Sequence, residues 1–130
     1  MDRSERVARL KAAQRMQIHD VEGWAVVTSH VSSFQASAAR ALIGLGADVA
    51  FVAGADGGVV RASLRSKEEF NKGTSIHLGR DLAIPLGEGF GGSGSGHISS
   101  AGLRVEGGTR PVLQRAVELI SAMLRTRRQA

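Results

Sequence analysis

The sequence has no cysteine, and its aromatic side chains are limited to Trp24 and four phenylalanines. Without cysteine the chain can form neither a disulfide framework nor a thiolate metal site, which fits a reducing compartment. Because aromatic residues are so few, the core must be built mainly from valine, leucine, isoleucine and alanine.

Long apolar segments are also missing. No run of apolar residues approaches the ~20 that a helix needs to span a bilayer. Residues 1–15 are charged but no hydrophobic segment follows them, so they do not form a secretory signal. We therefore expect a cytoplasmic protein that has no membrane partner.

The composition predicts one globular domain, with 130 residues, 42% of them hydrophobic and 22% charged. The net charge of +5 is unevenly distributed. Residues 1–15 carry +3 and residues 110–130 carry +4, whereas residues 16–109 carry −2. Because the basic excess lies at the two ends of the chain, the sequence argues against a broad basic groove that follows a phosphate backbone. A small pocket with one or two arginines remains compatible with it.

Residue periodicity predicts alternating helices and strands. Helices are expected at 3–16, 32–46, 75–90 with an interruption at Pro85, and from about Pro111; strand pairs are expected around Glu22-Gly23 and around residues 55–58, with a short strand at 103–107. A polar loop is expected around residues 71–73. This order predicts an α/β fold, in which a mixed β-sheet is flanked by helices in a single domain.

The second of these helices has clear local signals. Ser32 or Ser33 is expected to cap its first turn, and Gly44 and Gly46 to end it. Its apolar positions recur at three- and four-residue spacing: Phe34, Ala38, Ala41, Leu42 and Leu45.

The stretch EGFGGSGSGHISSAG, residues 88–102, is rich in glycine and serine. It is not a dinucleotide fingerprint, because a helix precedes it where that motif needs a strand. It is not a phosphate-binding P-loop either, since His97-Ile98 stands where Lys-Ser/Thr is required. Two interpretations remain, a mobile loop or a backbone cradle that binds an anion through N–H groups. The closely flanking apolar elements favour the cradle, with His97 as a donor at its rim.

The stretch VVRASLRS, residues 59–66, alternates in character. As a strand it places Arg61, Ser63 and Arg65 on one face, and Val60, Ala62, Leu64 and Ser66 on the other. Arginine binds phosphate through two parallel hydrogen bonds, so the first face can bind phosphate. A solvated sheet face is the alternative interpretation.

The sequence argues against a metal site. His19, His30, His77 and His97 show no spacing typical of metal ligands, and carboxylates are not clustered. No pair of carboxylates suited to acid–base catalysis stands out either. The chain lacks the parts of a self-sufficient enzyme.

Together, VVRASLRS and the later FGGSGSGHISSAG resemble the C-terminal substrate-binding domain of DHH-family phosphoesterases. This family includes RecJ-like exonucleases, oligoribonucleases and cyclic-dinucleotide phosphodiesterases, and a related domain ends alanyl-tRNA synthetases. The resemblance implies that residues 18–130 are the DHH-associated substrate-binding domain. Residues 1–17 would be an N-terminal helix or the remnant of an interdomain linker. The glycine segment is longer than the family's GGGGH, which leaves the size of the ligand open.

The resemblance also implies which residues bind the substrate phosphate: Arg61, Ser63, Arg65, Ser66, Gly91, Gly92, Gly94, Gly96 and His97. Ala101 and Gly102 close the motif. The family's D-H-H signature and its manganese ligands are absent, so we expect no catalytic and no metal-binding residues in this chain. Manganese is expected in a DHH catalytic domain, upstream in the same polypeptide, and we expect no hydrolysis by this chain alone.

The function that follows is a nucleic-acid or nucleotide phosphate-binding accessory domain. It would present a short single-stranded substrate or oligonucleotide to the manganese-dependent catalytic domain. The alternative is an RNA-binding or dimerisation module of the alanyl-tRNA-synthetase-associated type. In a homodimer, the glycine segment would serve only to allow close packing.

Overall fold

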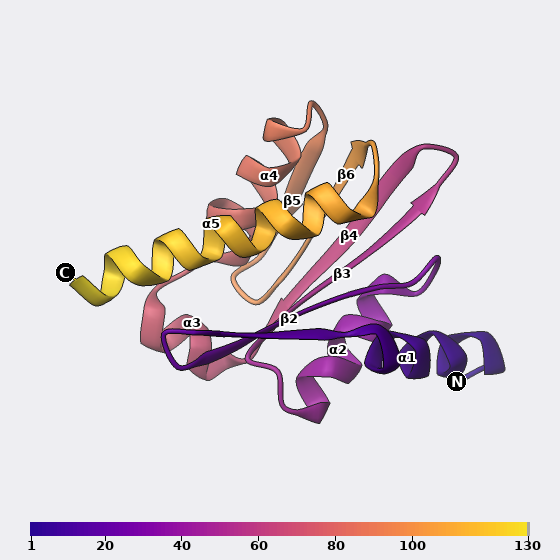
Figure 1. Ribbon diagram of the computed structural model, residues 1–130, viewed down its shortest axis with the longest axis horizontal. Helices are drawn as coiled ribbons and strands as arrows, with labels where there is room; N and C mark the ends of the chain where they lie inside the picture. Colours follow the sequence, from indigo (N-terminus) through magenta and orange to yellow (C-terminus); the bar gives the residue numbers. More distant parts are fainter. Residues whose placement is uncertain (130) are drawn as a thin grey trace.

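The computed structural model describes residues 1–129, so Ala130, at the end of the predicted domain of residues 18–130, lies outside it. The described residues form one α/β domain, a six-stranded mixed sheet with helices on both faces (Figure 1). The predicted fold class is confirmed. The elements are α1 (Arg3–Arg15), β1 (Gln17–Val21), β2 (Trp24–His30), α2 (Gln35–Leu45), β3 (Val49–Asp56), β4 (Val59–Ser66), α3 (Glu68–Thr74), the π-helical segment η1 (Leu78–Ala83), α4 (Ile84–Gly89), β5 (Ser93–Gly96), β6 (Ser100–Glu106) and α5 (Thr109–Gln129). None of the described helices is long and apolar enough to cross a membrane.

The strands lie in the order β1-β2-β3-β4-β6-β5. Only β2 and β3 are parallel among the described pairs, and α2 is the crossover between them. Two tight turns join the predicted hairpins, at Glu22-Gly23 with φ of 53° and 85° and at Gly57-Gly58 with φ of 59° and 82°. Positive φ at both central residues is typical of the two-residue turns that match the twist of a hairpin. Both hairpins are therefore confirmed.

Two apolar layers hold the helices on the sheet. Helices α1 and α2 pack on one face, and α3, η1, α4 and α5 pack on the other (Figure 1). Strand β3 contributes Phe51 to the second layer and Ala50 and Val52 to the first. This explains its unbroken apolar sequence, because both of its faces are covered.

Helix α2 differs from its prediction at the first turn and along its buried side. It begins at Gln35, and the capping position is Phe34, with φ 61° and no side-chain cap bond, so the expected cap at Ser32 or Ser33 is wrong. Leu45 is 65% exposed, whereas Ser37 is buried. The reason is the neighbouring helix: Arg9 Nε of α1 donates to Ser37 Oγ at 3.0 Å, which turns this small residue inward.

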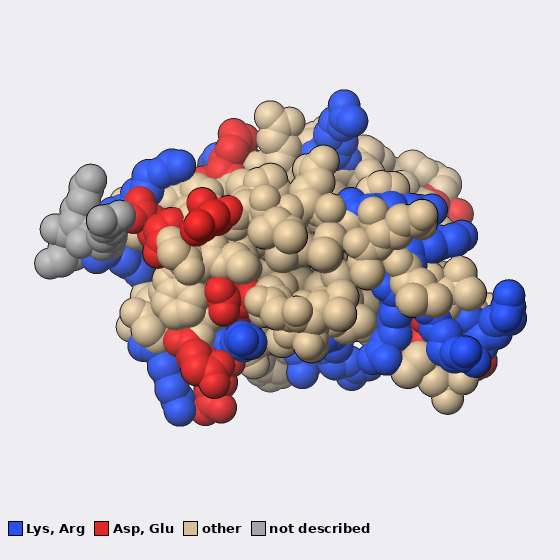
Figure 2. Space-filling model, turned by 60° about the horizontal axis from the view of Figure 1, so that its bottom comes forward, with Lys and Arg blue, Asp and Glu red and all other residues tan. Residues whose placement is uncertain are grey.

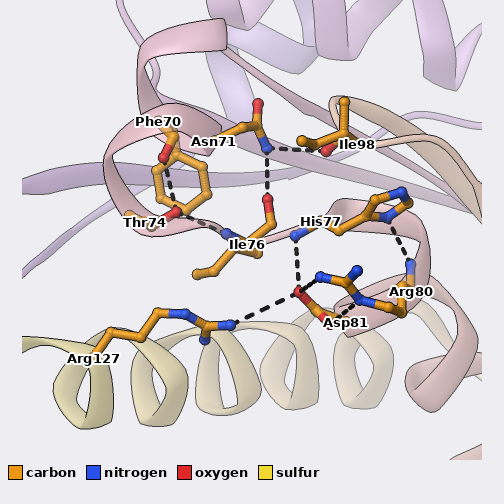
Figure 3. A network of polar contacts seen from close by, with 9 residues as sticks. All are labelled: Phe70, Asn71, Thr74, Ile76, His77, Arg80, Asp81, Ile98 and Arg127. Atoms are coloured by element: carbon orange, nitrogen blue, oxygen red, sulfur yellow. Dashed lines mark hydrogen bonds and ion pairs between the residues drawn. The ribbon is translucent and has the colours of Figure 1, made fainter. Parts of the chain in front are cut away.

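The predicted polar loop at residues 71–73 is wrong, because these residues lie within α3. The Asn71 side chain is buried and accepts from Ser66 Oγ. It also donates to the carbonyl of Ile76 (Figure 3). Its polarity therefore satisfies buried groups and does not mark a loop. The expected helix break is confirmed, since η1 gives way to α4 with Pro85 in the first turn of α4.

Candidate phosphate-binding face of the sheet

The glycine-rich segment contains a strand. Residues 93–96, which the sequence predicts as a loop, form the edge strand β5 and pair with β6 in antiparallel register. Along β5 the residues alternate serine, glycine, serine, glycine. Successive residues of a strand point to opposite faces, so the serines share one face and the glycines the other.

The glycines of this segment allow β5 to pack against helix backbone. A Cβ on Gly94 would collide with the carbonyl oxygen of Ala83 in η1, and one on Gly87 would collide with the backbone of Ser93 and Gly94. A Cβ on Gly92 would meet the carbonyl oxygen of Arg104. Glycine is needed here because the chain's own backbone fills the space of a side chain.

Several N–H groups of the predicted cradle already have acceptors within the chain. Gly91 N donates to the carbonyl of Glu88 at 3.0 Å, and Gly92 N donates to that of Gly87 at 2.8 Å. His97 N donates to the carbonyl of Ser100 at 2.8 Å, which closes the turn between β5 and β6. Close packing and turn closure therefore account for this part of the glycine pattern.

The serines of β5 lie on a sheet face that also carries arginines, which we call the open face. Cross-strand partners point to the same side of a sheet. The register pairs Arg61 with Arg104, Ser63 with Gly102 and Arg65 with Ser100, and then Ser93 with Arg104 and Ser95 with Gly102. On the opposite side, which we call the packed face, Leu64 and Leu103 are buried.

The open face continues beyond the helices that cover the rest of its side. Helix α2 packs on β3 and β4, whereas η1 and α4 pack on β5 and β6 from the packed face. The side chains of β5 and β6 on the open face, Ser93, Ser95, Ser100 and Arg104, are accordingly exposed. The predicted Arg61, Ser63 and Arg65 are thus brought together on this face.

Two arginines of the open face lie directly opposite each other. Arg61 of β4 and Arg104 of β6 are cross-strand partners and both are exposed. Neither has an ion-pair partner among the described residues. Like charges at opposed positions destabilise a sheet, so the pair favours a bound anion. Arg104 was not among the residues predicted from the sequence, although the alternation of residues 103–107 could have placed it.

A third guanidinium stands farther along the same face. Arg65 Nη1 donates to Ser100 Oγ at 3.4 Å. Ser66, by contrast, is buried on the packed face, where its hydroxyl donates to Asn71 Oδ1 at 2.8 Å. Of the predicted serines, Ser63 joins the arginines and Ser66 does not.

Three hydrogen bonds from α3 and η1 hold the β5–β6 turn, residues 97–99, in place. Leu78 N donates to the carbonyl of Ile98 at 2.9 Å, and Gly79 N donates to that of His97 at 3.0 Å. Asn71 Nδ2 also donates to the carbonyl of Ile98 at 2.9 Å (Figure 3). The exposed His97 therefore sits on a turn with a defined position, next to the Arg65 end of the open face.

An ionic contact fixes η1 in turn to α5. Arg80 Nε donates to Asp81 Oδ1 at 2.9 Å, and Arg127 of α5 lies 3.9 Å from the same carboxylate (Figure 3). The hydrogen bond from Arg80 holds the pKa of Asp81 below its usual range, and the backbone N–H of His77 contributes in the same direction. Among residues 1–129 no three His, Cys, Asp or Glu side chains lie close enough together to hold a metal ion.

Comparisons with known proteins bear on this arrangement. No family model matches the sequence. The chain is 40% identical over 104 residues to the uncharacterized protein MJ0988 of Methanocaldococcus jannaschii, which covers 78% of this chain and 31% of that protein. It thus spans about a third of the length of this curated relative.

Solved structures share the fold at low identity. The C-Ala domain of Aquifex aeolicus alanyl-tRNA synthetase matches with a TM-score of 0.64 and 15% identity, over 83% of this chain and 97% of that domain. A DHH-domain protein described as a member of the S1p family of ribosomal proteins matches at 0.63 and 12%, over 91% of this chain and 30% of that one. The pGpG-specific phosphodiesterase PggH of Vibrio cholerae matches with a TM-score of 0.54 and 10% identity, over 95% of this chain and 40% of that one.

The chain has the fold of these DHH-associated domains. The resemblance that the two sequence motifs indicated is confirmed at the level of the fold, and so is its extension to the alanyl-tRNA synthetase domain. In both DHH proteins the match covers less than half of the longer chain, so the fold forms one part of each.

Proposed function

We propose that this chain is the phosphate-binding accessory domain of a DHH-family phosphoesterase. It binds a short single-stranded nucleic acid across the open face and presents it to a catalytic domain. The observation that supports this proposal is the opposed pair Arg61 and Arg104, two exposed cations without a carboxylate partner in the described chain. A phosphodiester between them would relieve their repulsion and accept hydrogen bonds from both guanidinium groups.

The spacing of the arginines favours an oligonucleotide. Arg61 and Arg65 are four residues apart on β4, which corresponds to about 13 Å along a strand. At this separation the two positions would hold two phosphates of one strand. Gly102 lies between them, paired with Ser63, and leaves the floor of the face free of a side chain. His97, beyond Ser100, would donate to a terminal phosphate or stack against the end base.

Catalysis would come from outside the described residues. They offer no cluster of metal ligands, so the manganese that the resemblance implies does not fit this chain and would belong to a DHH catalytic domain. The greater length of MJ0988 and of the DHH proteins supports a partner domain of this kind.

A second candidate function is an RNA-binding or dimerisation module of the alanyl-tRNA-synthetase-associated type. The match to the C-Ala domain favours it, because the match covers 97% of that domain with a TM-score of 0.64. A homodimer of this chain would belong to this candidate. Preference for a structured RNA hairpin over a short single strand would support it.

The proposal is tested by fluorescence anisotropy with labelled five-nucleotide single strands of DNA and RNA. The variants are Arg61→Gln, Arg104→Gln, Arg65→Gln and His97→Ala. Arg125→Gln is the matched control, since Arg125 is an exposed arginine of α5, on the opposite side of the sheet. Removing a charged hydrogen bond to phosphate should weaken binding by about 1–3 kcal/mol.

The salt dependence separates specific from general attraction. Each arginine of the open face that binds phosphate should reduce the slope of log K against log salt by about one when it is replaced. Equal affinity in the open-face variants and in the Arg125→Gln control would overturn the proposal. Sedimentation of the free and bound chain reports whether a dimer forms, which bears on the second candidate.

A further inference from the structure

Two clefts lie away from the open face and meet each other. One lies between α1 and the carboxyl ends of the parallel strands β2 and β3, and the other between the β1–β2 hairpin and α5. Each has a volume of about 630 Å³, and Arg15, His30 and Thr109 line both. We call the combined cleft the groove. Its size is that of sites for small molecules.

The position of the groove is favourable for binding. In open α/β sheets, ligands bind outside the carboxyl ends of parallel strands. Here those ends are His30 of β2 and the segment 53–55 of β3, and both line the groove. None of the open-face side chains lines the groove, so it is a separate site, although Arg61 is the cross-strand partner of Gly54, which lines it.

The floor of the second cleft is polar where the rest of that sheet face is apolar. On the side facing α5, β3 and β4 present residues such as Phe51 and Leu64 to the core. On the same side, the β1–β2 hairpin presents Gln17, His19, Thr28 and His30. His19 Nε2 lies 3.3 Å from Thr28 Oγ1, so these side chains are ordered by each other. Gln17 and His30 are exposed at this patch, His19 is partly buried and Thr28 is buried, so the wall of the cleft opposite α5 carries hydrogen-bond donors and acceptors.

The two basic ends of the chain meet at this groove. Arg3, Lys11 and Arg15 come from α1 and Arg110 from the start of α5, and Glu118 is the one acidic side chain that lines it among the described residues. Figure 2 shows basic side chains gathered over the end of the molecule where α1 lies, whereas most acidic side chains of this view lie toward the other end. None of the four basic residues forms an ion pair within the described chain.

One of these cations is held in place. Arg15 Nη1 donates to the carbonyl of His30 at 3.2 Å, which positions its guanidinium where the two clefts join. The other guanidinium donors have no carboxylate to satisfy them. A preorganised arginine with free donors is suited to bidentate binding of an oxyanion.

We propose that the groove binds a small molecule carrying a phosphate or diphosphate group, with Arg15 and Arg110 as its principal ligands. Four basic against one acidic side chain match a ligand with two or more negative charges better than a single carboxylate. Among the described residues no phenylalanine, tyrosine or tryptophan lines the groove, and its rings are the imidazoles of His19 and His30, so we expect the phosphate charge to be recognised more strongly than a base. This site does not depend on the function proposed for the open face.

The test is a nuclear magnetic resonance titration of the ¹⁵N-labelled chain with inorganic pyrophosphate and, in parallel, with ADP. Amide shifts should cluster at residues 30–33, 53–55 and 109–110. Arg15→Gln and Arg110→Gln should each weaken pyrophosphate binding about tenfold, the effect of one charged hydrogen bond. Similar affinity for both probes means that charge alone is read, and tighter binding of ADP means that the groove also contacts the nucleoside.

Two controls keep the result specific. Arg125→Gln should leave the affinity unchanged, and Arg104→Gln should do so too, because Arg104 lies on β6 and lines neither cleft. Unperturbed spectra of the free variants establish that Arg15→Gln and Arg110→Gln remain folded. Shifts that cluster at residues 93–104, shifts that scatter over all exposed basic residues, or equal affinity in every variant would each overturn the proposal.

Discussion

The two faces of the β4–β6–β5 half of the sheet are built from the same strands but differ in how closely other elements pack against them. On the packed face the backbone of η1 comes so close that Gly94 has no room for a Cβ. On the open face, one residue away along β5 and β6, the serines and Arg104 are exposed, because α2 packs over β3 and β4 on that side of the sheet. Substitutions should therefore change stability on the packed face and ligand affinity on the open face.

This difference also changes the meaning of the glycine-rich segment. A flexible linker would have glycines in open space, but here the alternate glycines of β5 contact neighbouring backbone and its serines face outward. The segment is thus a rigid support for the open face. Substituting the packed glycines should lower the stability of the fold, whereas substituting open-face residues should change ligand affinity.

The largest effect is expected for Gly94→Ala. Its methyl group would overlap the carbonyl oxygen of Ala83, so β5 would have to move away from η1. Overpacking of this kind should lower the free energy of unfolding by about 3 kcal/mol. Urea denaturation followed by circular dichroism measures it.

Ser95→Ala is the matched control, because it changes the next residue of the same strand on the open face. It should alter the free energy of unfolding by less than about 0.5 kcal/mol, as is usual for surface positions. Equal losses in the two variants would mean that the faces of β5 do not differ as described.

A second, smaller effect is expected for Asn71→Ala. The variant loses the hydrogen bonds to Ser66, Ile76 and Ile98 and leaves buried groups unsatisfied. We expect a loss of about 2 kcal/mol in the free energy of unfolding, compared with about 1 kcal/mol for Ser66→Ala, which removes one of the three bonds.

The Asn71 variant also tests whether the packed side supports the ligand site. Since Asn71 holds the turn that carries His97, oligonucleotide affinity should fall in Asn71→Ala but not in Ser66→Ala at a temperature where both are folded. Unchanged affinity in Asn71→Ala would show that the position of the turn does not matter for binding.

The sequence predicted most of the fold because its elements have strong local signals. Turn residues predict the two hairpins locally, at Glu22-Gly23 and Gly57-Gly58. The apolar run of β3 predicts a strand that is covered on both faces. The predictions were wrong where the burial of a polar residue depends on a contact with a residue distant in the sequence. Ser37 is buried because Arg9 of α1 contacts it, and Asn71 is buried because it bridges α3 to the turn at Ile98.

The candidate site was predicted in part for the same reason. Strand alternation places Arg61, Ser63 and Arg65 on one face from local sequence alone. Arg104 joins them only through the register of β4 with β6, and Gly94 contacts η1 only through the sheet edge. Neither relation is written in a short stretch of sequence, since both depend on how separate elements pack.

A third prediction concerns pH and the packed side. The pKa of Asp81 is lowered, chiefly by the hydrogen bond from Arg80, so its ionised form stabilises the folded state. This contribution is present above the unfolded pKa, near 3.8, and is lost as the pH falls through the lower folded value. Asp81→Asn should be less stable than the natural chain by about 1 kcal/mol at pH 7.

The difference between these two chains should shrink when urea denaturation is repeated at pH 2.5, because this pH lies below the unfolded pKa of Asp81, near 3.8, where the contribution of its ionised form is being lost. A difference that stays constant from pH 7 to pH 2.5 would mean that the charge of Asp81 does not contribute and that only its shape matters. The control is Glu68→Gln, which removes an exposed carboxylate paired with Lys72 and should change the free energy of unfolding at pH 7 by less than about 0.5 kcal/mol.

The smallest effect on stability, and the most informative sign, is expected for Arg104→Gln. Removing one of two opposed like charges should raise the free energy of unfolding by a few tenths of a kcal/mol, roughly the cost of such a pair in a sheet. The same variant should bind a five-nucleotide strand more weakly than the natural chain. A gain in stability together with a loss of affinity is expected if the opposed arginines serve a ligand, because only the bound anion offsets their mutual repulsion. If Arg104→Gln instead loses stability and keeps its affinity, Arg104 supports the sheet and the open face has lost the observation on which its proposed function depends.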